Sequence, residues 1–486
     1  MEQPADPRAR RLFGGSARAL GDLAASPFRA DRDRIVGSPF FARLNGVTQV
    51  ISPGGSGLLV HNRLTHSLKV AQVARAIAER LTADPAHRRL LDELGHPPFG
   101  HLGERVLDRL ARQRLGLPDG FEGNAQSYRI VTSTEIRGAA TTGLDLTAAV
   151  RAALLKYPWT RLDHPDPHPR HLTPAPRGAA APPDDPESGS AKFGAYRTEL
   201  ADLRQAREPF AGRIADWQQT VEASVMDTAD DIAYAIHDVE DFYRVGVLQQ
   251  GAVAAELMAW QREGGHLRAV TDAALTGAAR RPGSAIERLR RQLHRKDGWI
   301  ADDDAFAAAV EHVRQELVEG LLAMPFDGSI EAEQYVARFS ARWTTRFVDA
   351  ITVVREPSVR SGHVLLAPAQ WHEVQVLKFV HHRFVLARPD LALHQRGQAR
   401  LLGALVEALW EWLLDPEEES RLPRRLHDLV ELAEAELHPR TADRIGRARG
   451  RAIVDFVAQL TDGQAVAMLD ALSGRSGALW TDAFVL

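Results

Sequence analysis

Apolar residues recur every three to four positions along most of the chain, and stretches that alternate polar with apolar residues are sparse. This spacing places the apolar side chains on one face of a helix. It predicts helices over 64–81, 102–115, 144–157 and 213–243, with helices resuming from 303 to the end of the chain. The pattern therefore indicates an all-α fold.

Three segments lack this periodicity. A Pro-Gly-Ser loop precedes 58–60, which could form one arm of a small hairpin. Residues 164–191 are rich in Pro, Ala, Gly and Asp, a composition typical of a mobile loop without a core of its own. A polar, Gly-containing break is expected over 264–298. The resulting division is an N-terminal lead-in over 1–60, a core over 61–245 and a C-terminal helical region over 246–486.

Composition narrows the chemistry. The 486 residues include no cysteine, so any metal ion must be held by histidine nitrogen and carboxylate oxygen. The formal net charge of −4 gives no general basic excess for nucleic acid or an anionic membrane. No apolar run is long enough to span a membrane, and no signal peptide opens the chain. We expect a cytoplasmic protein.

The first polar cluster, His61-Asn-Arg-Leu-Thr-His66, lies where a helix is predicted to begin. Arg63 and His66 are three residues apart and share a face. A helix N-terminus with an arginine beside it is suited to binding phosphate. The competing interpretation is a histidine that bonds to backbone at the helix cap.

The second cluster is Gly95-His-Pro-Pro-Phe-Gly-His101-Leu-Gly-Glu104, a rigid turn that leads into the next helix. The i, i+3 spacing lets the His101 imidazole and the Glu104 carboxylate meet, so that the carboxylate can orient the ring. Such a pair suits general acid/base catalysis. Histidines that only cap the helix are the alternative.

The third cluster is an acidic stripe on the predicted helix over 213–243. Asp227, Asp230, Tyr234, Asp238 and Asp241 recur at steps of three or four residues. A solvated face is the usual explanation of such a stripe. Here apolar residues lie between the acids, and a carboxylate in that setting needs a cation.

Together, several strings resemble the HD-domain deoxynucleoside triphosphate triphosphohydrolases, the dGTPase-like enzymes, in both wording and order. They begin with Arg43-Leu-Asn-Gly-Val-Thr-Gln49-Val and continue through the first two clusters. The later strings are Phe121-Glu-Gly-Asn124-Ala-Gln126, Leu155-Lys156-Tyr157-Pro, Lys192-Phe-Gly and Ala229-Asp230-Asp-Ile-Ala-Tyr234. The resemblance runs from about residue 26 to 243 and implies an HD-domain helical bundle with a C-terminal helical extension.

The resemblance also implies roles for residues at matching positions. His66 and Asp230 match metal ligands, with Asp231 a weaker choice than Asp230. His101 and Glu104 match a catalytic pair, and His96 lies beside the phosphates. Arg63 and Lys156 match phosphate contacts. The positions that match the lining of the nucleotide pocket are Gln49, Val50, Asn124, Tyr157, Tyr234 and Asp238.

The match breaks before the second cluster. Where the family has a His-Asp metal pair, this chain has Asp92 and Glu93, and the preceding helix is short. Three explanations stay open. A segment of the natural protein could be absent from this sequence, the chain could be a degenerate nucleotide-binding homologue, or Asp92 and Glu93 could bind metal instead.

The leading hypothesis is a metal-dependent hydrolase that converts a dNTP, in the manner of the dGTPase-like enzymes, to deoxynucleoside and inorganic triphosphate with Mn, Mg or Fe. The alternative is a nucleotide-binding pseudoenzyme or regulatory subunit. An HD phosphohydrolase acting on monophosphates or signalling nucleotides fits the strings less well, and nucleic-acid binding would be accessory. The resemblance implies a homo-oligomer, often a hexamer, and a nucleotide or single-stranded DNA effector.

Overall fold

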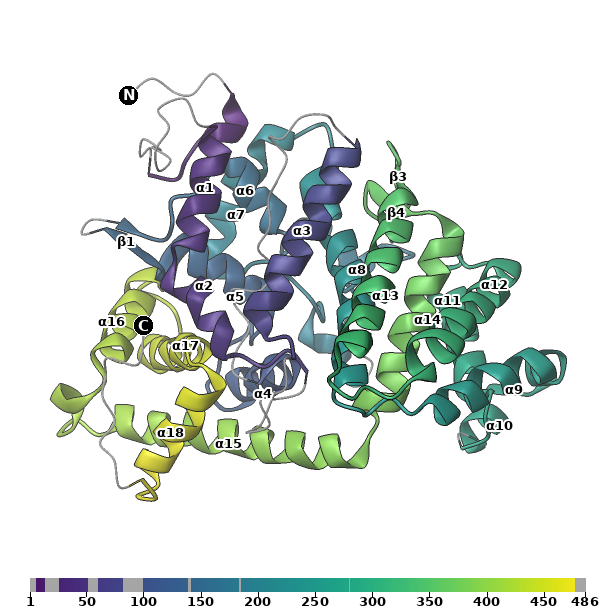
Figure 1. The fold of residues 1–486 in the computed structure, drawn as a ribbon. Helices are drawn as coiled ribbons and strands as arrows, with labels where there is room; N and C mark the ends of the chain where they lie inside the picture. Colours follow the sequence, from purple (N-terminus) through teal and green to yellow (C-terminus); the bar gives the residue numbers. More distant parts are fainter. Residues whose placement is uncertain are drawn as a thin grey trace.

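The computed structural model describes residues 6–13, 26–50, 60–81, 99–138, 141–182, 185–278 and 280–476. In these residues the prediction of an all-α fold is confirmed, because 18 α-helices are accompanied by only two short β-hairpins (Figure 1). The strands are β1 (Ile136–Gly138) paired with β2 (Thr141–Thr142), and β3 (Ile351–Val353) paired with β4 (Val364–Leu366). None of the described helices is both long and apolar enough to cross a membrane.

The first half of the chain supplies eight helices, several of them short. They are α1 (Pro27–Val36), α2 (Pro39–Arg43), α3 (Arg63–Leu81), α4 (Gly100–Gln113), α5 (Gly123–Arg129), α6 (Ala148–Leu154), α7 (Leu200–Arg207) and α8 (Val221–Arg244). In α3, Val70, Val73 and Ile77 are buried against Ile232 and Ile236 of α8. This apolar contact fixes the two helices side by side, and their polar residues carry most of the candidate site.

The second half is almost entirely helical. Its helices are α9 (Gln250–Ala269), α10 (Asp272–Gly277), α11 (Ser284–Asp297), α12 (Asp303–Val313), α13 (Ile330–Asp349), α14 (Pro368–His381), α15 (Pro389–Leu414), α16 (Arg424–Glu436), α17 (Arg444–Ala458) and α18 (Asp462–Leu472). Helices α9 to α14 extend the core around α3 and α8. The 26-residue α15 runs beneath α4 and joins α14 to the group α16–α18 (Figure 1).

Several predicted boundaries were wrong. The helix predicted over 144–157 is confined to α6, because Thr147 accepts a hydrogen bond from the backbone of Val150 and so caps the helix there. Likewise, α8 begins after its cap Thr220 rather than at 213. The break predicted over 264–298 is mostly helical, since it contains the end of α9 and all of α10 and α11.

The described residues of the segment 164–191 form no α-helix or strand, but the segment is not without a core. Ala179 is fully buried in a small cluster with Trp159, Phe193 and Tyr196. The Ser190 hydroxyl donates to the carbonyl of Ala179 and secures the fold of the segment. The hairpin arm predicted over 58–60 lies largely outside the described residues; next to it, Thr48 and Asn62 form an isolated antiparallel bridge.

Candidate active site

The centre of the candidate site lies where α3 meets α8. Arg63 and His66 occupy the first turn of α3, and each side chain is about 1% exposed. The Nε2 atom of His66 lies 3.3 Å from Oδ1 of Asp230 on α8. The two predicted metal ligands, 164 positions apart in the chain, are therefore adjacent. This separation suits two donors of one ion, which at bond lengths of about 2.0–2.2 Å lie roughly 3 Å apart.

Lys156 approaches the same carboxylate from the turn after α6. Its Nζ lies 3.0 Å from Oδ2 of Asp230 and 2.9 Å from Oδ1 of Asp227. Burial opposes ionisation of Asp230, but Lys156 and His66 outweigh it and hold its pKa well below the usual value. Asp230 is therefore an anion at neutral pH, ready to bind a cation.

His101 and Glu104 meet on the first turn of α4, where His101 Nδ1 lies 3.0 Å from Glu104 Oε2. The glutamate side chain is 8% exposed and the histidine side chain 55%, so a held carboxylate presents an accessible ring. The turn before α4 contains Phe99 with φ +66°, a conformation that residues other than glycine seldom adopt. Backbone strain of this kind is often found at functional sites.

Lys192 joins the two halves of the site. Its Nζ donates to Oε1 of Glu104 at 2.8 Å and to Oε1 of Glu122 at 2.9 Å. A Cβ built on Gly178 would lie 2.8 Å from Cβ of Lys192 and 2.9 Å from the ring of Tyr157, so these two side chains flank the same glycine. Lys192 thus connects the predicted catalytic pair of α4 with the turn that holds Lys156.

Glu122 caps α5 by accepting hydrogen bonds from the backbone of Asn124 and Ala125. Burial raises its pKa to about 7, although Lys192 partly offsets that rise and Glu104 adds to it. The side-chain amide of Asn124 also donates to Glu122, at 3.0 Å. Its carbonyl oxygen is buried without a hydrogen-bond partner among the described residues, which leaves an acceptor available in the site.

The predicted nucleotide-binding residues of α8 face α14. Oδ2 of Asp238 lies 3.0 Å from Nδ1 of His381, and both side chains are 2% exposed. The His381 ring is 4.9 Å from the ring of Tyr234. Gln49 is buried, and its Oε1 has no hydrogen-bond partner within the described part of the chain. Val50 is half-buried and packs on the core around α3 and α8.

Tyr157 packs on Trp159 with ring centroids 5.5 Å apart. Burial raises the pKa of Tyr157 to about 12, so its hydroxyl is a hydrogen-bond donor at neutral pH. Three predicted residues, His96, Asp92 and Glu93, lie outside the described residues.

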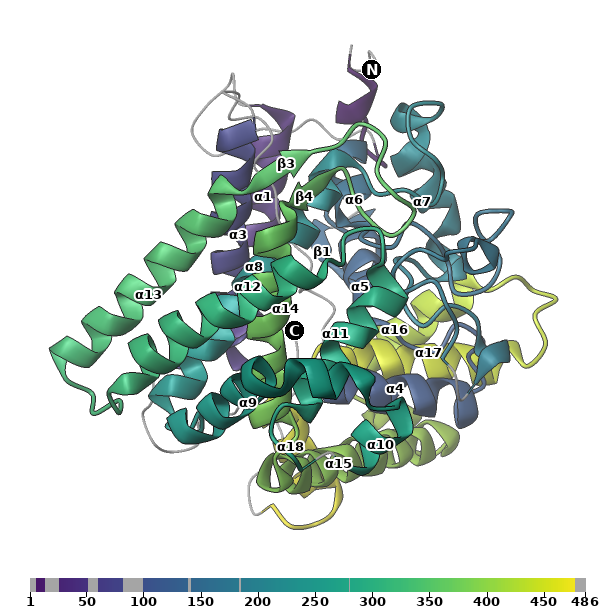
Figure 2. The same cartoon turned by 90° about the vertical axis from the view of Figure 1, so that its right-hand side faces the viewer.

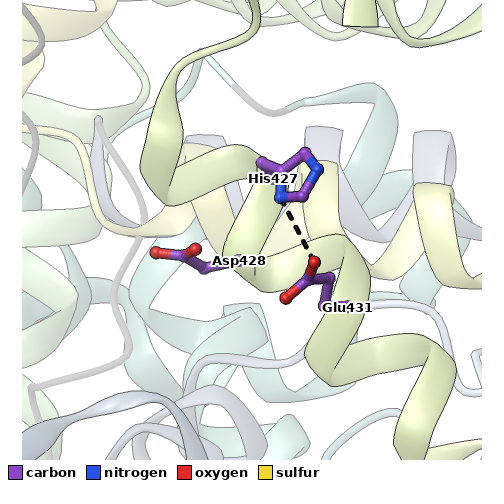
Figure 3. A group of neighbouring side chains, drawn as sticks. All are labelled: His427, Asp428 and Glu431. Carbon is purple, nitrogen blue, oxygen red and sulfur yellow. Dashed lines mark ion pairs between the residues drawn. The ribbon is translucent and has the colours of Figure 1, made fainter. Parts of the chain in front are cut away.

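Among the described residues, one group of at least three metal-ligating side chains gathers within 4.8 Å, and it is not at the predicted site. It consists of His427, Asp428 and Glu431 on the surface of α16 (Figure 3). His427 is half-buried and the two carboxylates are exposed; Nδ1 of His427 lies 3.6 Å from Oε1 of Glu431. Such i, i+4 pairs are common on solvated helices.

Three residues of the site were not given roles by sequence reasoning. Lys192 was present in the Lys192-Phe-Gly string, which was the only signal for it. Glu122 lies in the string Phe121-Glu-Gly-Asn124, two residues before the predicted Asn124. His381 lies 143 positions after Asp238, and nothing in the sequence around it indicates contact with Asp238.

Comparison with known proteins agrees with the motifs. Residues 364–471 match the family model of a phosphohydrolase-associated domain. A deoxyguanosinetriphosphate triphosphohydrolase-like protein of Streptomyces coelicolor is 33% identical over 461 residues, which cover 92% of this chain and 93% of the relative. Proteins of the same name from Bifidobacterium longum (30% identity; 91% of this chain, 82% of the relative) and Corynebacterium efficiens (27%; 93% of each) are also similar. The chain belongs to the deoxyguanosinetriphosphate triphosphohydrolase-like family of HD-domain proteins.

Proposed function

We propose that this protein hydrolyses a deoxynucleoside triphosphate, dGTP foremost, to deoxynucleoside and inorganic triphosphate with a divalent metal ion. The observation that carries the proposal is the junction of His66, Asp230 and Lys156, to which Lys192 connects the pair of His101 and Glu104. A metal-ligand pair, phosphate-binding cations and an oriented acid/base are the groups that phosphoester hydrolysis requires.

His66 and Asp230 would hold the ion, and a nitrogen-oxygen donor set suits Mn, Mg or Fe. When bound, such an ion polarises a phosphate oxygen or activates water. Asp92 and Glu93 remain proposed as further ligands. Lys156 and Arg63 would neutralise the phosphates, and Lys156 would then exchange one of its two carboxylates for a phosphate oxygen.

Proton transfer is assigned to His101. Glu104 accepts from the ring at 3.0 Å, and Glu104 is itself fixed by Lys192 and by the backbone N–H of Gly123 at 3.0 Å. An imidazole held at Nδ1 in this way can give or take a proton at Nε2 without losing its orientation. Asp238 and Gln49 offer acceptors for the sugar hydroxyl.

The alternative is a nucleotide-binding pseudoenzyme. The contact that favours it is Lys156, whose ammonium pairs with both Asp227 and Asp230 and so occupies a carboxylate oxygen that a metal ion would otherwise bind. In that case dNTPs bind but are not cleaved.

The test is a product assay on the full chain with each dNTP plus Mn²⁺ or Mg²⁺, in which inorganic triphosphate is separated by anion exchange. We expect triphosphate and deoxynucleoside in equal amounts. His101→Ala should lower kcat by roughly 10²–10⁴-fold, whereas the surface variant His427→Ala should match the parent. No product with any dNTP, together with calorimetric dNTP binding, would favour the pseudoenzyme; neither product nor binding would overturn both proposals.

A further inference from the structure

A second charged cavity is lined by residues of α10, α11 and α14 and lies beside the candidate site. The arrangement of these helices can be followed in Figure 2. Its volume is about 570 Å³, within the range of about 300–1,000 Å³ typical of small-molecule pockets. One wall contains Tyr234, Leu289 and Phe379. The basic residues that line it are Arg288, Arg291, Arg295, Lys378, His382 and Arg383.

The carboxylates nearby do not balance this charge. Among the described residues that line the cavity, Asp272 is the one acid, and it pairs with both Arg291 at 2.6 Å and Arg295 at 2.9 Å. Glu287 lies behind Arg291 and bonds its Nε at 3.0 Å. Lys378 is paired with Asp231 at 2.6 Å. Even with these acids counted, the charge of Arg288 has no counter-ion among the described residues.

Arg288 is the cationic side chain of the cavity that stands without a partner among the described residues. It is half-buried on α11, and no hydrogen bond or ion pair joins it to another described residue. Its Nε is buried without a partner. A buried guanidinium N–H without an acceptor is unfavourable, so an anion that accepts a hydrogen bond from Arg288 would be stabilised here.

We propose that this cavity binds a chain of phosphates, a ligand with the charge of inorganic triphosphate. Arg288 supplies the unpaired donors, while Arg383 and His382 line the same space. Several cations around one cavity match an extended polyanion better than a single carboxylate, and arginine favours phosphate oxygens because its donors form a planar fork.

The cavity is connected to the candidate site through Lys378. Its ammonium bonds Asp231, the neighbour of the proposed ligand Asp230, and lies 5.7 Å from the centre of the Tyr234 ring. A phosphate that draws Lys378 away from Asp231 would change the charge around Asp230. This effect on turnover rests on the proposed hydrolysis, whereas the binding itself does not.

The binding is tested by titration calorimetry of the full chain with sodium triphosphate in a metal-free EDTA buffer at low salt. We expect Arg288→Gln to weaken triphosphate binding by roughly tenfold or more, and Arg288→Lys to retain part of the affinity. The matched control is Lys296→Gln, which removes an exposed charge from the same helix outside the cavity. Circular dichroism establishes that each variant is folded.

A second variant, Lys156→Gln, tests whether triphosphate binds at the candidate active site instead. If it abolishes triphosphate binding and Arg288→Gln does not, the ligand binds at the active site and the proposal is overturned. The proposal is also overturned if the parent and Arg288→Gln bind triphosphate with equal affinity and also bind dGTP with equal affinity. If Arg288→Gln loses binding of both ligands, the phosphate chain is the recognised group. If it loses binding of dGTP alone, the ligand is the nucleotide; if it loses binding of triphosphate alone, the ligand is the free anion. Because EDTA prevents turnover, a failure of the proposed hydrolysis would not alter these results.

Discussion

Replacement of Arg129 by methionine should destabilise the whole protein. Arg129 is the last residue of α5 and is fully buried. Its guanidinium contacts three carboxylates, those of Glu199 at 2.6 Å, Asp455 at 2.8 Å and Glu436 at 2.9 Å. Two of them belong to α16 and α17, so one side chain holds the C-terminal helices against the core.

The expected loss of stability follows from the buried carboxylates that the substitution leaves without their arginine partner. Removal of one partner from a buried ion pair costs about 3–5 kcal/mol, because the remaining charge is buried without compensation. Protonation can relieve part of that cost. Burial already raises the pKa of Glu199 to about 7 although Arg129 opposes the rise, so loss of the arginine raises it further.

The sign of the pH dependence is fixed by this shift. A carboxyl whose pKa is raised in the folded state binds a proton that the unfolded state has released, so stability falls as pH rises. In the parent this loss levels off once the pH exceeds about 7. In Arg129→Met it continues, so the difference between the two proteins should grow by up to about 1 kcal/mol from pH 7 to pH 8, since the parent still loses a small part of its own contribution over that range.

The assay is urea unfolding followed by circular dichroism at pH 7 and pH 8. Arg342→Met is the matched control, because it breaks a surface pair with Glu316 whose arginine is 64% exposed. A surface pair contributes only about 0–1 kcal/mol. Equal unfolding midpoints for the two variants would refute the reasoning, as would a difference that shrinks at the higher pH.

Three further predictions concern the candidate site. Asp230→Asn should abolish metal-dependent turnover and raise the Kd for Mn²⁺, measured by calorimetry; an unchanged Kd would place the ion elsewhere. Gly194→Ala should impair activity more than folding, because the new Cβ would lie 2.3 Å from the carbonyl oxygen of Tyr157 and displace the turn that presents Lys156; activity equal to the parent would contradict this. Glu122→Gln should flatten the decline in stability between pH 4.5 and pH 7 by up to about 3 kcal/mol, because it removes a carboxyl with a raised pKa; parallel pH profiles of melting temperature would count against it.

The helices were predictable where burial is one-sided. The apolar spacing of 64–81 matches α3 to within one residue, because that face is buried against α8. Two predicted helix starts were wrong because capping residues set the true start. Thr147 and Thr220 cap helices that begin inside longer periodic stretches. Glycine and charge near 264–298 suggested a break, but tertiary contacts of α9 and α11 override that composition.

The candidate site was predictable in part. Spacing alone could pair His101 with Glu104, since both lie on one helix. His66 and Asp230 are 164 positions apart, and only the resemblance to a family brought them together. The roles of Lys192 and His381 depend on contacts between segments far apart in the chain, which no local pattern encodes.

The C-terminal third, whose role the sequence left open, completes the site from the outside. Asp462, at the start of α18, accepts from the backbone N–H of Thr48 at 3.1 Å and from that of Phe99 at 2.8 Å. One carboxylate thus joins the segment that ends in Gln49 to the strained turn that begins the helix of His101. Because the site consists of segments that α18 holds together, we expect precise placement of the catalytic pair to depend on the C-terminal helices, although they supply neither member of it.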